Sequence, residues 1–382
     1  MTDLLAYFQS QQPAMVDLLT TLVNYETPTR GKAEVDALGA FMEQQFRALG
    51  ASSVTRIPQA EVGDMLLAKW YETHSGPPIL FLIHIDTVWP VGTLAARPVR
   101  IDDDGRLFGP GAVDMKGGIT IVLTVLRGLI ERGELPQRPI WVLMTTDEEI
   151  GSIHSAPVII DTAKQCGLVL VMEPATPEEA LKTWRKGIAT YEVQVQGRAS
   201  HAGNAPEAGI NAIVELAQQI MELNAMNDLR HGTSVSVTMV SGGITMNVIP
   251  PHAEAMVDVR TLTARAYDEV NARILALTPF VPGAKLTIRQ HHARGPMERN
   301  ARMIAAFEQA KAIGAHYGLT IREDGSGGGS DGNLTAYEGI TTLDGLGPQG
   351  DGLHAEHEHV VINSLPRRAT LIAGILRDWQ FD

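Results

Sequence analysis

The chain has one cysteine, no long apolar run and no cluster of basic residues, and each absence excludes a class of protein. Cys166 stands alone, so no internal disulfide can form, which fits the reducing cytoplasm where we expect this protein. No stretch approaches the ~18 uninterrupted apolar residues of a membrane span. The N-terminal region also lacks the basic start of a secretory signal.

Positive charge is the scarcer kind. Lys and Arg number 31 against 44 Asp and Glu, which gives a net charge of −13. A negative chain without basic clusters binds nucleic acid and anionic membranes poorly, so we expect neither as a partner. Carboxylates gathered at one place would instead suit a divalent cation.

Apolar residues are plentiful enough to build a folded protein. They make up 44% of the chain, and charged residues only 20%, which excludes a disordered polymer. A length of 382 residues exceeds one ordinary hydrophobic core, so we expect two domains.

The two ends of the chain have the pattern of an α/β domain. Short runs rich in Ile, Leu and Val alternate with helical patterns, which is typical of a buried sheet with helices on both faces. The predicted strands are 65–70, 79–85, 140–144 and 168–172, and the predicted helices are 15–23, 38–49, 117–131, 301–317 and 365–379. We assign residues 1–183 and 292–382 to this discontinuous domain.

The middle of the chain, residues 184–291, has a different pattern. Alternating strands are expected at 191–196, 234–240, 253–260 and 285–290, with helices at 209–223 and 264–277. The order strand–helix–strand–strand–helix–strand is that of a ferredoxin-like, split βαβ domain. We therefore predict a smaller α+β domain inserted into the larger one.

Polar residues follow the predicted strands of the larger domain, where open α/β sheets bind ligands. His84 ends one strand, and Asp86 lies on the same face two residues later, so Asp86 could orient His84 as a metal ligand. A core histidine beside a turn is the alternative. Asp114 follows a glycine-rich loop and either reaches the same site or caps the next helix. That loop has neither phosphate-loop nor dinucleotide-binding spacing.

More carboxylates follow the next two strands. Three consecutive acids end in Glu148 and Glu149, and they form either a solvated turn or a cation site with one ligand and one base. Glu173 follows the fourth strand, and His354 lies in a polar loop that could be a plain surface turn.

Two histidines with several carboxylates make a donor set that suits zinc, cobalt or manganese rather than copper or an iron–sulfur cluster. A single catalytic zinc uses three protein ligands. The larger number of candidates here therefore favours two metal ions.

The order of these motifs resembles the dinuclear-zinc aminoacylase and carboxypeptidase family that includes glutamate carboxypeptidase, acetylornithine deacetylase and succinyl-diaminopimelate desuccinylase. The resemblance runs from Ile83 to Glu358 and so covers nearly the whole chain. The matching motifs are His84-x-Asp86, Gly111-x-x-Asp114-x-Lys116-Gly117-Gly118, Asp147-Glu148-Glu149-x-Gly151, Glu173-Pro174, Ser200-His201-Ala202-Gly203, Gly329-Ser330-Asp331 and His354-Ala355 with Glu358.

The resemblance implies a fold with a mixed sheet and two divalent metal ions per chain, zinc in the first place and cobalt or manganese otherwise. Asp114 would bridge the two ions, and its peptide bond to Met115 would be cis. His84 and Glu173 would complete one site, and Glu149 and His354 the other. Glu148 would be the general base, and Asp86 would orient His84. The resemblance gives His357 and His359 no role, and we expect both in a solvated turn.

The resemblance also gives the inserted domain a function in dimerisation and as a lid. His201 would reach the active site of the partner in a homodimer and support the oxyanion. Asn247 and Arg260 would meet the substrate, with Arg260 suited to its carboxylate. Gly329 lies in a loop expected near that same carboxylate.

Together these expectations describe a metal-dependent hydrolase that cleaves an amide or peptide bond next to a free carboxylate, as glutamate carboxypeptidase does. The alternative is an N-acyl amino acid deacylase of the acetylornithine deacetylase or succinyl-diaminopimelate desuccinylase type. A non-enzymatic metal-binding scaffold of the same fold is a third reading, and the presence of Glu148 beside Glu149 counts against it.

Overall fold

The computed structural model describes residues 4–381, and the chain divides into two compact units. The smaller unit comprises Trp184–Glu298 and Ser326–Gly329, and the larger unit comprises the rest. The sequence analysis ended the inserted domain at residue 291, whereas the first segment of the smaller unit continues to Glu298. Residue 291 lies inside a strand that ends at Arg294. A β-bulge between Gln290 and His292 breaks the alternating pattern there, which explains the early end.

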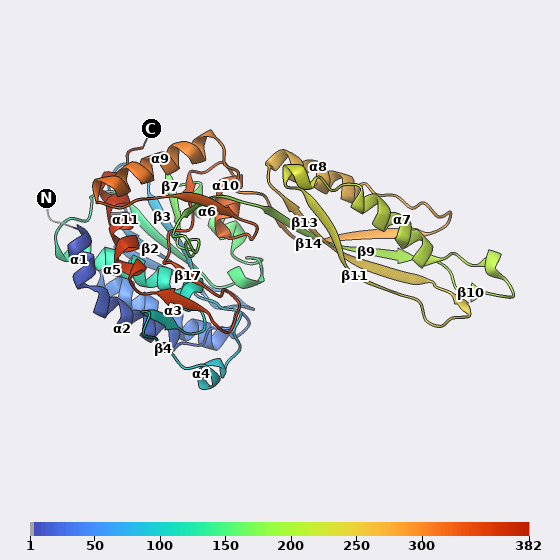
Figure 1. Cartoon of the computed structure of the whole chain (residues 1–382), viewed down its shortest axis with the longest axis horizontal. Helices are drawn as coiled ribbons and strands as arrows, with labels where there is room; N and C mark the ends of the chain where they lie inside the picture. Colours follow the sequence, from blue (N-terminus) through green and yellow to red (C-terminus); the bar gives the residue numbers. More distant parts are fainter. Residues whose placement is uncertain (1–3, 382) are drawn as a thin grey trace. The chain divides into compact units, whose positions relative to one another are not determined.

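A mixed six-stranded sheet forms the centre of the larger unit (Figure 1). Its strands, in spatial order, are β1 (Ser53–Ile57), β2 (Met65–Trp70), β6 (Ile140–Thr145), β3 (Ile79–His84), β7 (Leu168–Val171) and β16 (Thr342–Leu343). The pairs from β6 to β16 are parallel, and those from β1 to β6 are antiparallel. The mixed sheet expected from the sequence is confirmed.

Helices cover both faces of this sheet, so successive side chains of its central strands pack into two different apolar clusters. Ile79, Phe81 and Ile83 belong to one apolar cluster, while Leu80 and Leu82 belong to another. The first cluster includes residues of α1 (Leu4–Ser10), α2 (Gln12–Val23), α3 (Lys32–Ala48), α5 (Gly117–Glu131), α9 (Ala301–His316) and α11 (Ser364–Asp378). The second includes residues of α6 (Ala156–Ala163) and α10 (Asp331–Tyr337).

Short elements complete the larger unit. A second sheet has the order β17 (Gly350–Asp351), β18 (His359–Val361), β5 (Arg106–Phe108) and β4 (Arg100–Ile101). The helix α4 (Thr93–Ala96) precedes β4, and β15 (Glu323–Ser326) pairs with β8 (Leu181–Arg185). Strands of two or three residues carry too little pattern to be seen in a sequence, and none of these was predicted.

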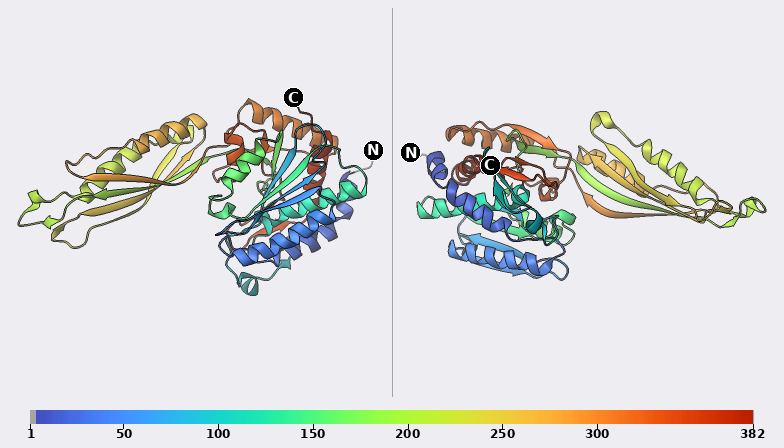
Figure 2. Two further views of the ribbon diagram at one scale, coloured as in Figure 1. Left: turned by 180° about the vertical axis from the view of Figure 1, so that it is seen from behind. Right: turned by 60° about the horizontal axis from the view of Figure 1, so that its bottom comes forward.

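The smaller unit is a four-stranded antiparallel sheet with two helices (Figures 1 and 2). Its strands, in spatial order, are β11 (Ser234–Gly242), β13 (His252–Thr261), β9 (Gly187–Gln196) and β14 (Lys285–Arg294). The helices α7 (Ala212–Asn224) and α8 (Ala264–Leu275) share one core with the alternate residues Ala189, Tyr191 and Val193 of β9. Both helices therefore cover the same face, as the split βαβ pattern requires.

A separate two-stranded antiparallel sheet lies beyond the main sheet of the smaller unit, where β10 (Ser200–His201) pairs with β12 (Val248–Ile249). Across residues 4–381, no helix is both long enough and apolar enough to span a membrane.

Candidate metal centre

Most of the predicted ligands lie at the carboxyl ends of three neighbouring strands. Strand β3 lies between β6 and β7 and is parallel to both, so all three strands end at the same edge of the sheet. His84 is the last residue of β3, Glu148 and Glu149 follow β6, and Glu173 follows β7. A ligand site at this edge is the general property of open α/β sheets.

Asp114 lies between the two predicted histidine ligands. Its Oδ1 is 3.1 Å from His84 Nε2, and its Oδ2 is 3.4 Å from His354 Nε2. The residue is buried in the turn Ala112–Lys116, its dihedral angles are not helical, and the peptide bond to Met115 is cis. The expected cis bond is therefore present, and Asp114 does not act as a simple helix cap.

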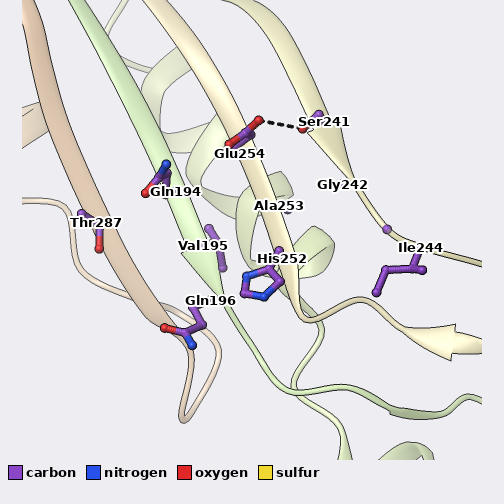
Figure 3. A pocket seen from close by; sticks show the side chains of 11 residues that line it. Gln194, Val195, Gln196, Ser241, Gly242, Ile244, His252, Ala253, Glu254 and Thr287 are labelled. Carbon is purple, nitrogen blue, oxygen red and sulfur yellow. Dashed lines mark hydrogen bonds between the residues drawn. The ribbon is translucent and has the colours of Figure 1, made fainter.

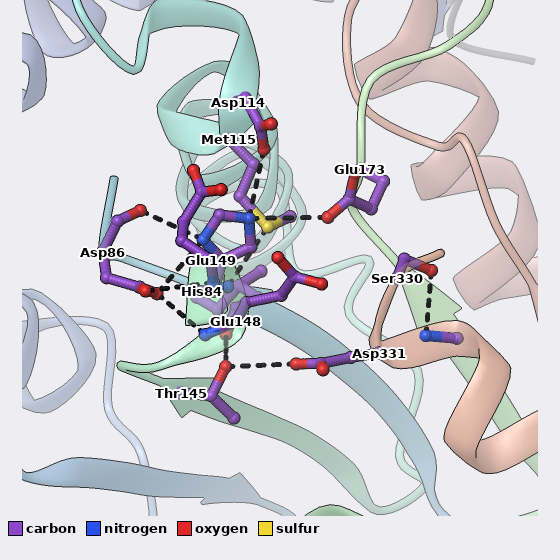
Figure 4. A network of polar contacts seen from close by, with 12 residues as sticks. His84, Asp86, Asp114, Met115, Thr145, Glu148, Glu149, Glu173, Ser330 and Asp331 are labelled. Atoms are coloured by element: carbon purple, nitrogen blue, oxygen red, sulfur yellow. Dashed lines mark hydrogen bonds and ion pairs between the residues drawn. The ribbon is translucent and has the colours of Figure 1, made fainter. Parts of the chain in front are cut away.

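The remaining candidate ligands lie on either side of Asp114 (Figure 4). Glu173 Oε1 is 3.4 Å from His84 Nε2, and Glu149 Oε2 is 3.0 Å from His354 Nε2. Ligand atoms of His84, Asp114 and Glu149 lie within 4.8 Å of one another, and the same holds for His84, Glu148 and Glu173. Imidazole and carboxylate donors at such spacing fit divalent zinc, cobalt or manganese.

The charges of this cluster shift the pKa values of its members. Burial alone would raise the pKa of Asp114, yet hydrogen bonds from His354 and His84 hold it well below its usual value. Asp114 and Glu149 raise the pKa of His354 to about 10, and burial raises the pKa of Glu149. Carboxylates packed this closely need a compensating positive charge, which a bound cation would supply.

Asp86 contacts more of the site than the sequence indicated. Its main-chain carbonyl lies 3.1 Å and its Oδ1 3.4 Å from His84 Nδ1, so both parts of Asp86 contact the ring. The same carboxylate accepts hydrogen bonds from the backbone N–H groups of Glu148 and Glu149, each at 3.2 Å, and from Thr29 Oγ1 at 2.7 Å. One buried side chain therefore fixes both the histidine and the turn that carries the two glutamates.

Asp147 and Asp331 hold the same region, and the sequence gave neither a role. Asp147 Oδ2 accepts the backbone N–H groups of His154 and Ser155, so the first of the three consecutive acids is structural. Asp331 accepts a hydrogen bond from Thr145 Oγ1 at 3.3 Å (Figure 4). It also accepts one from Ser152 Oγ. The Gly329-Ser330-Asp331 motif was the available signal for this contact.

The other predicted site residues belong to the smaller unit. His201, in β10, is exposed, and its Nδ1 accepts the backbone N–H groups of Gly203 at 3.1 Å and Asn204 at 3.0 Å. An accepting Nδ1 carries no proton, so Nε2 is the donor. Asn247 directly precedes β12, the partner strand of β10, and its carbonyl accepts the N–H of Ala202 at 2.9 Å.

Arg260 lies far from the β10–β12 pair within the same unit. Strand β13 starts at His252, close to β12, and Arg260 follows eight residues later, which is about 27 Å along an extended strand. Asp258 binds Arg260 through Nε at 2.8 Å and Nη2 at 2.9 Å. Gly329 accepts a hydrogen bond from Arg185 Nη1 at 3.3 Å. The structure thus brings His201 and Asn247 together and keeps Arg260 apart from them.

A hollow of about 630 Å³ also lies on the helix-free face of this unit (Figure 3). Its lining includes Gln194, Ser241, His252 and Glu254, but none of the predicted site residues.

The sequence as a whole identifies the family. The pattern of Peptidase family M20/M25/M40 matches residues 80–378, which is well over half of the chain. The chain belongs to this family. As an M20 family member it is a metallohydrolase of amide bonds, which confirms the expected reaction class.

Relatives of this M20 family protein include both expected reaction types. Carboxypeptidase G2 of a Pseudomonas species is 33% identical over 375 residues, which cover 96% of this chain and 90% of the relative. Succinyl-diaminopimelate desuccinylase of Halorhodospira halophila is 29% identical over 320 residues, covering 79% of this chain and 83% of the relative.

Solved structures share the fold of this M20 family protein. Aminopeptidase PepT of Bacillus cereus gives a TM-score of 0.75 at 21% identity and covers 96% of this chain and 98% of its own. An M20 family metallo-carboxypeptidase of Sulfolobus solfataricus gives 0.70 at 17% identity, covering 95% and 98%. At these identities the likeness shows the fold alone.

Proposed function

We propose that this M20 family protein is a dinuclear metal hydrolase that releases an amino acid such as glutamate by cleaving the amide bond next to its free carboxylate. The observation that supports it most is the position of Asp114, whose two carboxylate oxygens face two different imidazoles. A carboxylate with one oxygen toward each of two ligand sets is suited to bridging two cations. The 33% identity to Carboxypeptidase G2 favours a carboxypeptidase.

In this proposal each ion has its own ligands besides the shared Asp114. His84 and Glu173 hold one ion, and Glu149 and His354 hold the other, in line with their contacts. Zinc is the proposed metal, with cobalt or manganese as substitutes that the donor set also accepts. Bound there, two divalent ions supply Lewis-acid polarisation of the scissile carbonyl and a lowered pKa of the attacking water.

The proton transfers fall to Glu148. It lies next to Glu149 in the turn after β6, and Asp86 fixes the backbone of both residues. The Glu148 carboxylate takes a proton from the attacking water and then gives it to the leaving amine. Asp86 keeps the His84 ring oriented through Nδ1.

The smaller unit is proposed to bind the substrate and to form a homodimer. His201 offers Nε2–H to the developing oxyanion, and Arg260 offers Nη1, which its ion pair with Asp258 leaves available among the described residues. Asn247 and the Gly329 loop complete the substrate contacts.

The distance from His201 and Asn247 to Arg260 supports a site shared between chains. About 27 Å of extended β13 separates the two ends, so one small substrate cannot touch both within one copy of this unit. A two-fold dimer resolves this if the partner supplies His201 and Asn247. The edge strand β11 and helix α7, which expose Val240 and Met221, offer an apolar surface for that contact.

N-acyl amino acid deacylase activity is the second candidate, and the similarity to succinyl-diaminopimelate desuccinylases favours it. The cytoplasmic location inferred from the single cysteine stays a prediction.

A hydrolysis screen of the metal-loaded protein tests the proposal. The substrates are folate-like amides of glutamate, N-acetyl and N-succinyl amino acids, and amidated versions of each that lack the free carboxylate. We expect glutamate release from the carboxylate-bearing amides, little from the amidated controls, and none after chelation. A higher kcat/KM for N-acyl amino acids would favour the deacylase. Two bound ions without any hydrolysis would favour the scaffold.

A further inference from the structure

Glu358 is a buried carboxylate between His354 and β18, and only 2% of it is exposed. We propose that Glu358 is a positioning residue, which fixes the main chain of the Asp114 turn against the loop that carries His354 and so sets the spacing of the metal centre. This inference rests on the proposed function, because it concerns the two loops that close that centre.

The carboxylate of Glu358 accepts four hydrogen bonds from groups more than 240 residues away in the sequence. Its Oε1 accepts the backbone N–H groups of Val113 at 3.0 Å and Asp114 at 3.2 Å. Its Oε2 accepts the N–H of Gly111 and Nε1–H of Trp89, both at 2.8 Å. Four acceptor positions are what an ionised carboxylate offers, so none is left for a cation.

The position of Glu358 follows from strand pairing. His359 of β18 pairs with Phe108 of β5, which places Glu358 opposite Gly109 at the entrance to the Asp114 turn. The N–H of Gly109 donates to the Glu358 carbonyl at 3.3 Å, and the N–H of Glu358 donates to Ala355 at 3.1 Å. Main chain and side chain therefore tie the same two loops together.

The Asp114 turn needs such an acceptor. The turn Ala112–Lys116 is buried, and Asp114 and Met115 have non-helical dihedral angles, so its N–H groups need acceptors from elsewhere in the chain. Glu358 accepts three N–H groups of this buried segment, those of Gly111, Val113 and Asp114 itself. Since the Asp114 carboxylate extends from this same peptide, a shift of its N–H displaces the oxygens that face His84 and His354.

The chemistry of the contact explains why a carboxylate is needed. Glutamine has the same size, but only one of its two terminal atoms accepts a hydrogen bond. In a Glu358→Gln variant, the amide NH₂ would face either the Gly111–Trp89 pair of donors or the Val113–Asp114 pair. Two buried N–H groups would lose their acceptor, and the turn would have to move.

The test compares Glu358→Gln with Trp89→Phe, which removes one of the four donors, and with Glu356→Gln as a control. Glu356 is an exposed glutamate two residues away on the same loop. For each protein we would measure Zn²⁺ affinity by chelator competition, the visible spectrum of the Co²⁺-loaded form, kcat and KM, and the melting temperature of the metal-free form.

We expect Glu358→Gln to weaken binding of metal by roughly 10- to 100-fold, the range for groups that orient metal ligands, and to change the Co²⁺ spectrum. Its kcat should fall while KM changes little, because the groups proposed to bind the substrate carboxylate are untouched. Trp89→Phe should weaken metal binding and lower kcat in the same direction, each by only several-fold. Glu356→Gln should match the parent protein.

A Glu358→Gln protein with parental metal affinity, Co²⁺ spectrum and kcat would overturn the inference, even if it melted at a lower temperature. Should that variant fail to fold, a folded Trp89→Phe with parental metal affinity and spectrum would overturn it equally. A parent protein that binds fewer than two ions would instead contradict the proposed function.

Discussion

At the scale of single residues, the proposed function gives two adjacent glutamates of one turn different roles. Glu149 contacts His354 at 3.0 Å, whereas Glu148 points toward the group formed with His84 and Glu173. Adjacent residues of a tight turn project in different directions, so a ligand and a base can be separated by one peptide unit. Proximity alone does not distinguish them, because Glu148 also lies within ligand distance.

Replacing Glu148 separates these two roles. We expect Glu148→Ala to lower kcat by roughly 10²- to 10⁴-fold, the usual contribution of a general base, while both metal ions stay bound. The measurements are steady-state kinetics and metal per chain by elemental analysis. Exposed Glu178→Ala is the control for loss of one surface charge, and Glu149→Ala should lose metal. A loss of half the metal or more in Glu148→Ala would show that Glu148 is a ligand.

The sequence predicted the residues of this site better than it predicted their supports. His84, Asp114, Glu149, Glu173 and His354 could be found because each follows a recognisable strand or lies in a recognisable motif. The contact of Asp86 with the Glu148 turn joins positions 62 residues apart. No local pattern records such a pairing, which appears only once β3 and β6 lie side by side.

At the scale of elements, the site depends on how closely α5 approaches the end of β7. A Cβ added at Gly118 would lie 2.2 Å from the carbonyl oxygen of Met172, the residue before Glu173. Gly347 approaches the same oxygen from another loop, and a Cβ there would lie 2.5 Å from it. The peptide that carries Glu173 is therefore enclosed by glycines.

An alanine at Gly118 should disturb both packing and metal binding. We expect Gly118→Ala to lower the free energy of unfolding by about 1–3 kcal/mol, the usual cost of overpacking, and to weaken metal binding by moving Glu173. Gly39→Ala is the matched control within helix α3, because its new Cβ would meet only Met144 Cε at 3.7 Å. That control should gain up to about 1 kcal/mol from helix propensity.

Denaturant unfolding of the metal-free proteins measures both changes, and chelator competition measures the metal. Equal stability of the Gly118→Ala and Gly39→Ala variants would contradict the close approach of α5 to the Met172 peptide.

Element prediction succeeded where a pattern was long enough. Strand β2 and helix α5 match the predicted bounds. Met65–Trp70 is apolar except for Lys69, and Gly117–Glu131 begins with two glycines and ends at a charged residue. β17 and β18 escaped prediction because strands of two and three residues show no period. These short strands nevertheless bring Glu358 to the Asp114 turn.

At the scale of the whole molecule, the arrangement of the smaller unit bears on how many chains make one site. His201 and Asn247 lie together at the β10–β12 pair, and Arg260 lies near the other end of β13. The sequence pattern predicted the order of strands and helices in this unit but not this separation, which depends on the length of β13.

Mixing two inactive variants tests whether His201 acts on the partner chain. His201→Ala should lose an oxyanion donor, which costs about 2.7–4 kcal/mol of transition-state stabilisation, and should keep its metal. Glu148→Ala should be inactive for want of its base. In a mixed dimer, the site on the His201→Ala chain would combine its own Glu148 with His201 of the Glu148→Ala chain.

Counting sites gives the size of the effect. Random exchange of equal amounts makes half of the dimers mixed, with one intact site each, so activity should return to about one quarter of the parental value. If His201 acted within its own chain, neither site of a mixed dimer would be complete and no activity would return. Subunit exchange must be shown separately, with differently tagged chains, so that absence of recovery reports on His201 rather than on slow mixing. A fully active monomer in light scattering would contradict the shared site directly, because a single copy would then supply every group.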